Sequence, residues 1–297
     1  MSAETRLTSA NEREIKRVTF IGMIINIALS ALKFAAGIFG NSQALVADAF
    51  HSLSDCVTDV AVLIGSSYWS APPDETHPHG HRRIETVITV FIGLALVVVA
   101  LMIGWNAVST MMDKDNEPPE MIAFIAAVLS IGTKEGLYQW TAIVGKKVKS
   151  SAMIANAWHH RSDAFSSIPA AVAIIAAILL PGYGFIDHIG AMLVCLFILH
   201  AAYKISWTAL CELTDAGASQ KVCDTIELLA KQVEGVKDVH KCRTRYLGSG
   251  LQVDLHVLVD PELSVREGHD ISAKVKEELI KKGPEVIDVV VHLEPFE

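Results

Sequence analysis

Six long apolar segments limit the fold of this chain more than any other feature of its sequence. A helix needs roughly 20 apolar residues to cross a lipid bilayer, and it satisfies its own backbone polar groups there. Turn-forming residues such as Gly40, Pro118 and Pro181 separate the segments. The pattern predicts six transmembrane helices, at residues 18–39, 44–69, 84–111, 121–144, 151–180 and 186–210.

Composition agrees with a membrane protein, since 51% of the residues are hydrophobic and only 20% are charged. The net charge of −8 and the lack of a basic stripe in the sequence argue against nucleic acid as a partner. The fourth segment is the weakest because it contains Lys134 and Glu135. We expect these two either to pair with each other or to face the interior of the helix bundle.

Basic residues flank the predicted helices on one side, which indicates how the chain is oriented. Loops rich in Lys and Arg stay on the cytoplasmic side of a membrane. These residues precede the first helix or follow the second and fourth: Arg13, Lys16, Arg17, Arg82, Arg83, Lys146, Lys147 and Lys149. Both termini are therefore predicted to be cytoplasmic. Residues 1–17 are expected to form a cytoplasmic N-terminal segment, and residues 18–211 the membrane domain.

The remaining part, residues 212–297, has the composition of a small water-exposed domain. An amphipathic helix is predicted at 220–233 and a second helix at 265–281. Strands are predicted at 238–247 and 251–260, around Gly248 and Gly250, and at 286–293. The order α-β-β-α-β is typical of a ferredoxin-like α+β domain.

Two H-x-x-x-D motifs are the strongest chemical signal. His51 and Asp55 lie in the second predicted helix, and His159 and Asp163 lie in the fifth. A spacing of four places each pair on one helix face, and ionisable residues inside a bilayer typically mark a functional site. Two imidazoles and two carboxylates suit a tetrahedral Zn²⁺ site, with Co²⁺ or Fe²⁺ as rivals. The alternative is that they are polar residues that pack the helices together.

Other polar residues lie close to these motifs in the sequence. Asp48 and Asp59 continue the same face of the second helix. Each either supports the metal ligands or lies at a water-exposed helix end. His160 is the neighbour of His159, and Arg161 is the nearby basic residue.

A short histidine cluster joins the second and third predicted helices. His77, His79 and His81 follow Asp74 and Glu75, a composition typical of metal binding. The alternative is a solvated polar loop that caps the third helix.

Further histidines lie in the tail, and from the residues alone they are either metal ligands or surface side chains. These are His240, His256, His269 and His292, followed by Glu294.

The residues at 44–55, ALVADAFHSLSD, together with HHRSD at 159–163, resemble the signature of the cation diffusion facilitator family. The resemblance extends over the whole chain and implies six membrane helices followed by a cytoplasmic α-β-β-α-β domain. It implies a homodimer in which Arg83 and Asp215 form a charge pair at a hinge. The implied metal ligands are His51, Asp55, His159 and Asp163 for transport, Asp74, His77 and His81 in the loop, and His240, His256, His269, His292 and Glu294 in the tail. Glu294 stands where the family often has an aspartate.

The function implied is divalent metal efflux from the cytoplasm, with Zn²⁺ favoured over Mn²⁺ and with Fe²⁺, Co²⁺ and Cd²⁺ as further candidates. His and Asp bind a metal only when they are deprotonated, so binding releases protons, and histidine titrates near neutral pH. We therefore expect metal/proton antiport by alternating access in a bacterial inner membrane, with metal binding to the tail as regulation. Two alternatives are a metal-responsive scaffold or sensor without transport, and an intramembrane metalloenzyme. The sequence lacks the helical H-E-x-x-H motif expected of such a metalloenzyme, so no enzyme activity is expected.

Overall fold

The computed structural model describes residues 3–111, 117–148, 150–180, 182–248 and 250–297. The chain separates into two compact units, one made of residues 1–64 and 92–203 and the other of residues 65–91 and 204–297. Six long helices span the first part of the sequence. They are α1 (Ala3–Phe39), α2 (Gln43–Trp69), α3 (Arg83–Met111), α4 (Met121–Lys147), α5 (Ser151–Leu179) and α6 (Phe185–Leu213).

Five of these helices are long and apolar enough, over their described residues, to cross a membrane. The ranges are Glu14–Phe39, Arg83–Met111, Met121–Lys147, Met153–Leu179 and Phe185–Leu213. The sixth predicted span, α2, is helical but does not appear among the five, and several of its side chains lie outside the described residues. The structure thus confirms a helical membrane domain with five candidate spans.

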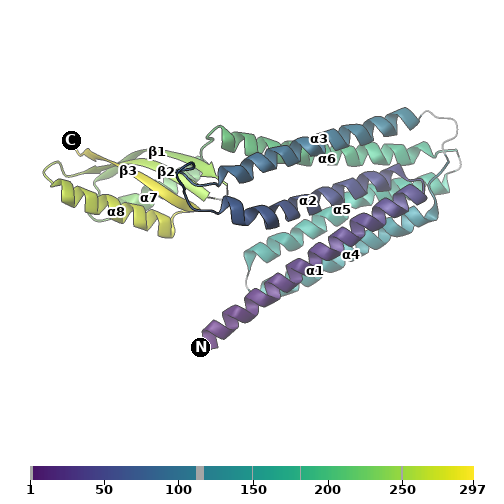
Figure 1. The fold of residues 1–297 in the computed structure, drawn as a ribbon, viewed down its shortest axis with the longest axis horizontal. Helices are drawn as coiled ribbons and strands as arrows, with labels where there is room; N and C mark the ends of the chain where they lie inside the picture. The colour runs from purple at the N-terminus through teal and green to yellow at the C-terminus, as the bar shows by residue number, and fades with distance from the viewer. Residues whose placement is uncertain (1–2, 112–116, 149, 181, 249) are drawn as a thin grey trace. The chain divides into compact units, whose positions relative to one another are not determined.

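Small side chains dominate the core of the first unit. α4 and α5 run side by side, and α1 packs against α4 (Figure 1). Helices approach closely at Gly190 of α6, where an added Cβ would lie 2.4 Å from Cβ of Ala173 and 3.1 Å from Cβ of Ala44. Small residues let membrane helices approach this closely, so van der Waals contact can hold them together. The buried alanines of this core include Ala36, Ala44, Ala47, Ala123, Ala126, Ala127, Ala170 and Ala191.

The N-terminus of α2 is fixed by a side chain from α6. The Asp187 carboxylate accepts hydrogen bonds from Ser42 Oγ at 2.7 Å, from Gln43 N at 2.6 Å and from Ala44 N at 3.2 Å. A negative charge is favourable at a helix N-terminus, where backbone N–H groups lack partners within the helix. This contact positions the helix on which His51 and Asp55 lie.

The tail has the predicted α-β-β-α-β order. Its elements are α7 (Gln220–Lys231), β1 (Asp238–Leu247), β2 (Gly250–Val259), α8 (Val265–Lys282) and β3 (Val286–Pro295). The sheet order is β1-β2-β3, with β1 antiparallel and β3 parallel to β2. Alternate residues of β2, among them Val253, Leu255 and Val257, are buried with apolar residues of α7 and α8. Both helices therefore cover one face of the sheet (Figure 1), and the other face is free for polar residues.

Candidate metal-binding sites

Three of the four predicted transport ligands come together in the first unit. His51, Asp55 and Asp163 each offer a ligand atom, and these atoms lie within 4.8 Å of one another. The spacing of four on α2 directs His51 and Asp55 to the same side, and Asp163 reaches them from α5. One nitrogen and two carboxylates form a donor set that suits a first-row divalent ion.

Two polar atoms of this group fit an ion-binding role. Nδ1 of His51 and Oδ2 of Asp55 are buried and have no hydrogen-bond partner among the described residues. A buried polar atom without a partner is unfavourable, and each one calls for an explanation. A transported cation would satisfy both of them.

The fourth predicted ligand, His159, lies at the margin of the site. Its Nδ1 is 3.7 Å from Oδ1 of Asp163, but its side chain is 50% exposed and it is not part of the group within 4.8 Å. Its neighbour His160 is buried instead, and Nδ1 of His160 has no partner among the described residues. The structure therefore brings three of the four predicted transport ligands together and leaves His159 at the edge of the group.

A buried lysine, Lys134, contacts the site, and its partner Asp163 was not predicted from the sequence. Nζ of Lys134 on α4 lies 2.9 Å from Oδ2 of Asp163, and both side chains are almost fully buried. Lys134 therefore faces the bundle interior and does not pair with Glu135. Glu135 lies 3.6 Å from Arg161, whose guanidinium stacks over the ring of Tyr138. Arg161 is the basic residue nearest to Asp163 in the sequence, but Lys134 is the cation that contacts Asp163 in the structure.

Asp48 belongs to a second buried ion pair. Its Oδ2 lies 2.7 Å from Nζ of Lys33, and its Oδ1 accepts a hydrogen bond from Ser167. Lys33 also donates to the hydroxyls of Ser52 and Ser167, so the network joins α1, α2 and α5. Because Asp48 is fully buried, the interpretation of it as a water-exposed helix end is wrong. The side chain of Asp59 lies outside the described residues.

The loop between α2 and α3 brings its three predicted ligands together. Asp74 lies 3.3 Å from Nδ1 of His77 and 3.3 Å from Nε2 of His81. The backbone N–H of His77 and the hydroxyl of Thr76 both donate to Asp74, and these bonds lower the pKa of its carboxyl to about 2. His81 is buried, and its Nδ1 has no partner among the described residues. The group is thus a compact N₂O donor set.

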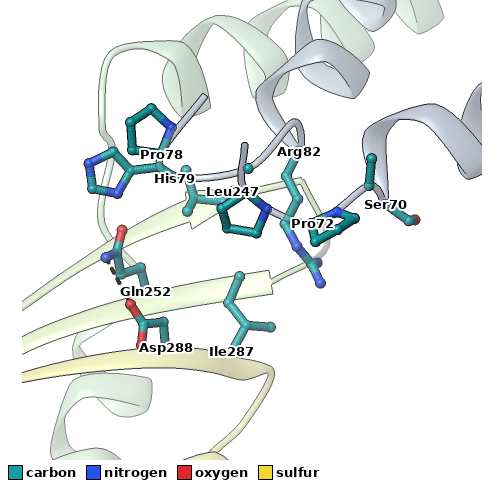
Figure 2. A pocket seen from close by; sticks show the side chains of 12 residues that line it. Ser70, Pro72, Pro78, His79, Arg82, Leu247, Gln252, Ile287 and Asp288 are labelled. Carbon is teal, nitrogen blue, oxygen red and sulfur yellow. Dashed lines mark hydrogen bonds between the residues drawn. The ribbon is translucent and has the colours of Figure 1, made fainter. Parts of the chain in front are cut away.

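His79, the additional histidine of this loop, is not part of that group. It lines a pocket of about 300 Å³ between the loop and the sheet of the tail. Figure 2 shows His79 beside Pro78, with Arg82, Gln252 and Asp288 around the same pocket. His79 is therefore not among the ligand atoms that the structure brings together in this loop.

Strand register assembles the tail site. His240 of β1 is the cross-strand partner of His256 on β2, and His256 is the partner of His292 on β3. Glu294, two residues after His292, is on the same face of β3. The three histidines therefore form one row across the sheet, on the side away from α7 and α8.

Glu294 connects this row. It lies 2.8 Å from Nε2 of His240 and 2.7 Å from Nδ1 of His256, and these hydrogen bonds, with that from His256 the stronger influence, lower the pKa of the Glu294 carboxyl. Ligand atoms of His240, His256 and Glu294 lie within 4.8 Å of one another. His292 is adjacent, with Nε2 3.7 Å from Glu294. The structure does not bring His269 into the group, because it lies exposed on α8.

The predicted charge pair is formed: a guanidinium nitrogen of Arg83 hydrogen-bonds Oδ1 of Asp215. Glu212 reinforces the same region, since it accepts from the hydroxyl of Thr86 at 2.6 Å and from the backbone N–H of Gly248. These contacts connect the start of α3, the end of α6 and the β1–β2 turn.

Comparison with known proteins gives matches over nearly the whole chain. The cation efflux transmembrane domain matches residues 19–214, and the cation efflux protein cytoplasmic domain matches residues 218–296.

Three relatives illustrate the range of the similarity. An uncharacterized transporter of Methanocaldococcus jannaschii is 37% identical over 90% of this chain and 94% of its own length. Metal tolerance protein C1 of Arabidopsis thaliana is 34% identical over 95% of this chain, which spans only 63% of that relative's length. Manganese efflux system protein MneS of Bacillus subtilis is 34% identical over 93% of this chain and 95% of its own. The chain therefore belongs to the cation diffusion facilitator family of divalent metal cation transporters.

Proposed function

We propose that this protein exports a divalent transition-metal ion from the cytoplasm, with Zn²⁺ as the favoured substrate. The observation that carries the proposal is the group formed by His51, Asp55 and Asp163 inside the helical unit, with ligand atoms within 4.8 Å of one another. His159, 3.7 Å from Asp163, supplies the fourth ligand when the site closes on the ion. The set lacks a thiolate, which suits an ion that must leave again.

The choice of metal rests on the ligand types. Imidazole nitrogen favours Zn²⁺, Fe²⁺ and Co²⁺, whereas an all-oxygen set suits Mn²⁺. Cd²⁺ is a further candidate. MneS, by its name, is a manganese efflux protein, so Mn²⁺ is the competitor that a transport assay has to include.

Transport proceeds in this proposal as metal/proton antiport by alternating access. The ligands bind metal only when they are deprotonated, so metal binding on one side and protonation on the other drive exchange. All six helices, α2 included, cross a bacterial inner membrane with both termini in the cytoplasm. Residues 1–17 form the N-terminal segment, residues 18–211 the transport domain and residues 212–297 the cytoplasmic domain.

The loop and tail groups have a regulatory role in this proposal. The protein acts as a homodimer, and metal binding to His240, His256 and Glu294, assisted by His292, favours the active dimer. The loop group of Asp74, His77 and His81 binds a further ion. The family model that matches residues 218–296 describes a cytoplasmic domain of cation efflux proteins, which supports a cytoplasmic location for the tail.

The test is flux into proteoliposomes that hold a zinc-sensitive dye, under an imposed pH gradient. Asp55→Asn and His51→Ala should reduce Zn²⁺ flux to that of empty vesicles, because each removes a ligand of the group. His79→Ala is the matched control, since His79 lies outside the three metal groups, and its flux should equal that of the unsubstituted protein. Flux that persists in Asp55→Asn would exclude this site.

A second candidate function is a metal-responsive scaffold or sensor that does not transport. The tail group favours it, because His240, His256 and Glu294 lie together within one small domain. The same vesicles separate the two functions. A sensor would bind Zn²⁺ through its tail and give no flux in the unsubstituted protein.

A further inference from the structure

Lys134 is a buried cation within hydrogen-bond distance of a proposed transport ligand. It lies in the middle of α4, it is 1% exposed, and its Nζ is 2.9 Å from Oδ2 of Asp163. The other oxygen of Asp163, Oδ1, faces His159. The two oxygens of this carboxylate are thus divided between an ammonium group and a metal ligand.

The charges of the site give this contact a consequence. Asp55 is a partly buried carboxylate and Asp163 a buried one, and Lys134 supplies one positive charge. When both carboxylates are deprotonated and the ammonium is present, the metal-free site has one net negative charge, and the site with a divalent ion has one net positive charge. Without the ammonium, the empty site would hold two uncompensated negative charges. Uncompensated charge is costly inside a membrane, and electrostatic interactions are strong where water is excluded.

We propose that Lys134 is a positioning residue that acts as the internal counter-cation of the empty transport site. This inference rests on the proposed function. The ammonium holds Asp163 through Oδ2 while no metal is bound, and it repels an arriving divalent ion. It therefore weakens metal binding and favours release of the ion.

The competing explanation is that Lys134 only holds α4 and α5 together. The contact between Glu135 and Arg161, 3.6 Å apart, joins the same two helices. The chain offers a matched control for this alternative. Lys33 and Asp48 form a second buried Lys–Asp pair, 2.7 Å apart, and Asp48 is not one of the proposed ligands. Loss of Lys33 should destabilise the bundle without tightening metal binding.

The experiment measures KM and kcat for Zn²⁺ transport in proteoliposomes for Lys134→Met, Lys134→Gln, Lys134→Arg and Lys33→Met. Close charge pairs have coupling energies that correspond to about tenfold or more in affinity. Lys134→Met should therefore lower KM by about tenfold and also lower kcat, because metal binds more tightly and leaves more slowly. Lys134→Arg should restore values near those of the unsubstituted protein, because it keeps the charge.

Lys134→Gln keeps the result decisive if the methionine variant does not fold, since its amide can still donate to Asp163 but is neutral. A lower KM with a lower kcat in that variant supports the inference. An unchanged or raised KM overturns it, as would the same fall of KM in Lys33→Met. Failure of the proposed function looks different, because the unsubstituted protein would then give no flux at all.

Discussion

Nδ1 of His256 lies 2.7 Å from the Glu294 carboxylate, and the same carboxylate lies 2.8 Å from Nε2 of His240. The side chain of Glu294 is one methylene group longer than that of an aspartate. The longer side chain reaches both histidines, which belong to two different strands. Because Glu294 connects the two imidazoles, the affinity of the tail for metal should depend on its charge.

Glu294→Gln should weaken metal binding to the tail while keeping the shape of the side chain. Loss of a group that only orients a ligand costs about tenfold or more in affinity, so loss of a ligating carboxylate should cost at least as much. The measurement is a Zn²⁺ titration of the full-length protein in which Asp55→Asn and His77→Ala silence the other two groups. Glu277→Gln, an exposed acid on α8, is the control. Equal affinities for the two glutamine variants would contradict the assignment.

The contact between Lys276 and Asp288 should make the stability of the tail depend on pH. Lys276 Nζ lies 2.7 Å from Asp288 and lowers the pKa of that carboxyl in the folded state. A carboxyl with a depressed folded pKa stabilises the protein above its unfolded pKa of about 4 and loses this contribution as the pH falls through the folded pKa. Both side chains are nearly half exposed, so the effect at pH 7 should be about 0.2–1 kcal/mol.

Asp288→Asn should thus lower the free energy of unfolding at pH 7 by that small amount, and the difference from the unsubstituted protein should shrink below pH 4. Urea unfolding followed by circular dichroism at several pH values measures it. Lys276→Met should show a similar loss at pH 7. A difference that grows as the pH falls would show that the sign is wrong.

The buried pair of Lys33 and Asp48 should matter more for stability than any surface pair. Lys33→Met leaves Asp48 buried without its counter-charge, and breaking a buried pair in this way costs about 3–5 kcal/mol. Lys33→Met with Asp48→Leu removes both charges and should recover much of that loss. Thermal unfolding of the purified protein in detergent gives the comparison. If the double variant were less stable than Lys33→Met, the charge would not be the cause.

The sequence predicted those parts of the structure that depend on local patterns. The order of helices and strands in the tail was predicted correctly, and the spacing of His51 and Asp55 predicted that they share one side of α2. The row formed by His240, His256 and His292 additionally required the strand register, which the sequence alone does not give.

Contacts between helices were not predictable in this way. The sequence left open whether Lys134 pairs with Glu135 or faces the bundle interior, and it did not identify the partner, Asp163, which lies 29 residues away on α5. Lys33 was not recognised as a partner of Asp48 for the same reason, although a lysine within an apolar segment was a usable signal. The rotation of each helix about its axis decides such pairs, and it also leaves His159 half exposed while His160 is buried.

Asp187 provides the last prediction, because it fixes the start of the helix on which His51 and Asp55 lie. Asp187→Ala removes the acceptor of the Ser42 hydroxyl and of the Gln43 N–H, and loss of such a cap costs about 0.5–2 kcal/mol. We therefore expect a lower unfolding midpoint in detergent and, because α2 is then less well positioned, a raised KM for Zn²⁺. Asp187→Asn keeps one acceptor oxygen, so its unfolding midpoint and KM should lie between those of Asp187→Ala and the unsubstituted protein. Asp270→Ala, at an exposed position of α8, is the control and should change neither value. A midpoint for Asp187→Ala that equals the control's would show that the α6 carboxylate does not stabilise α2.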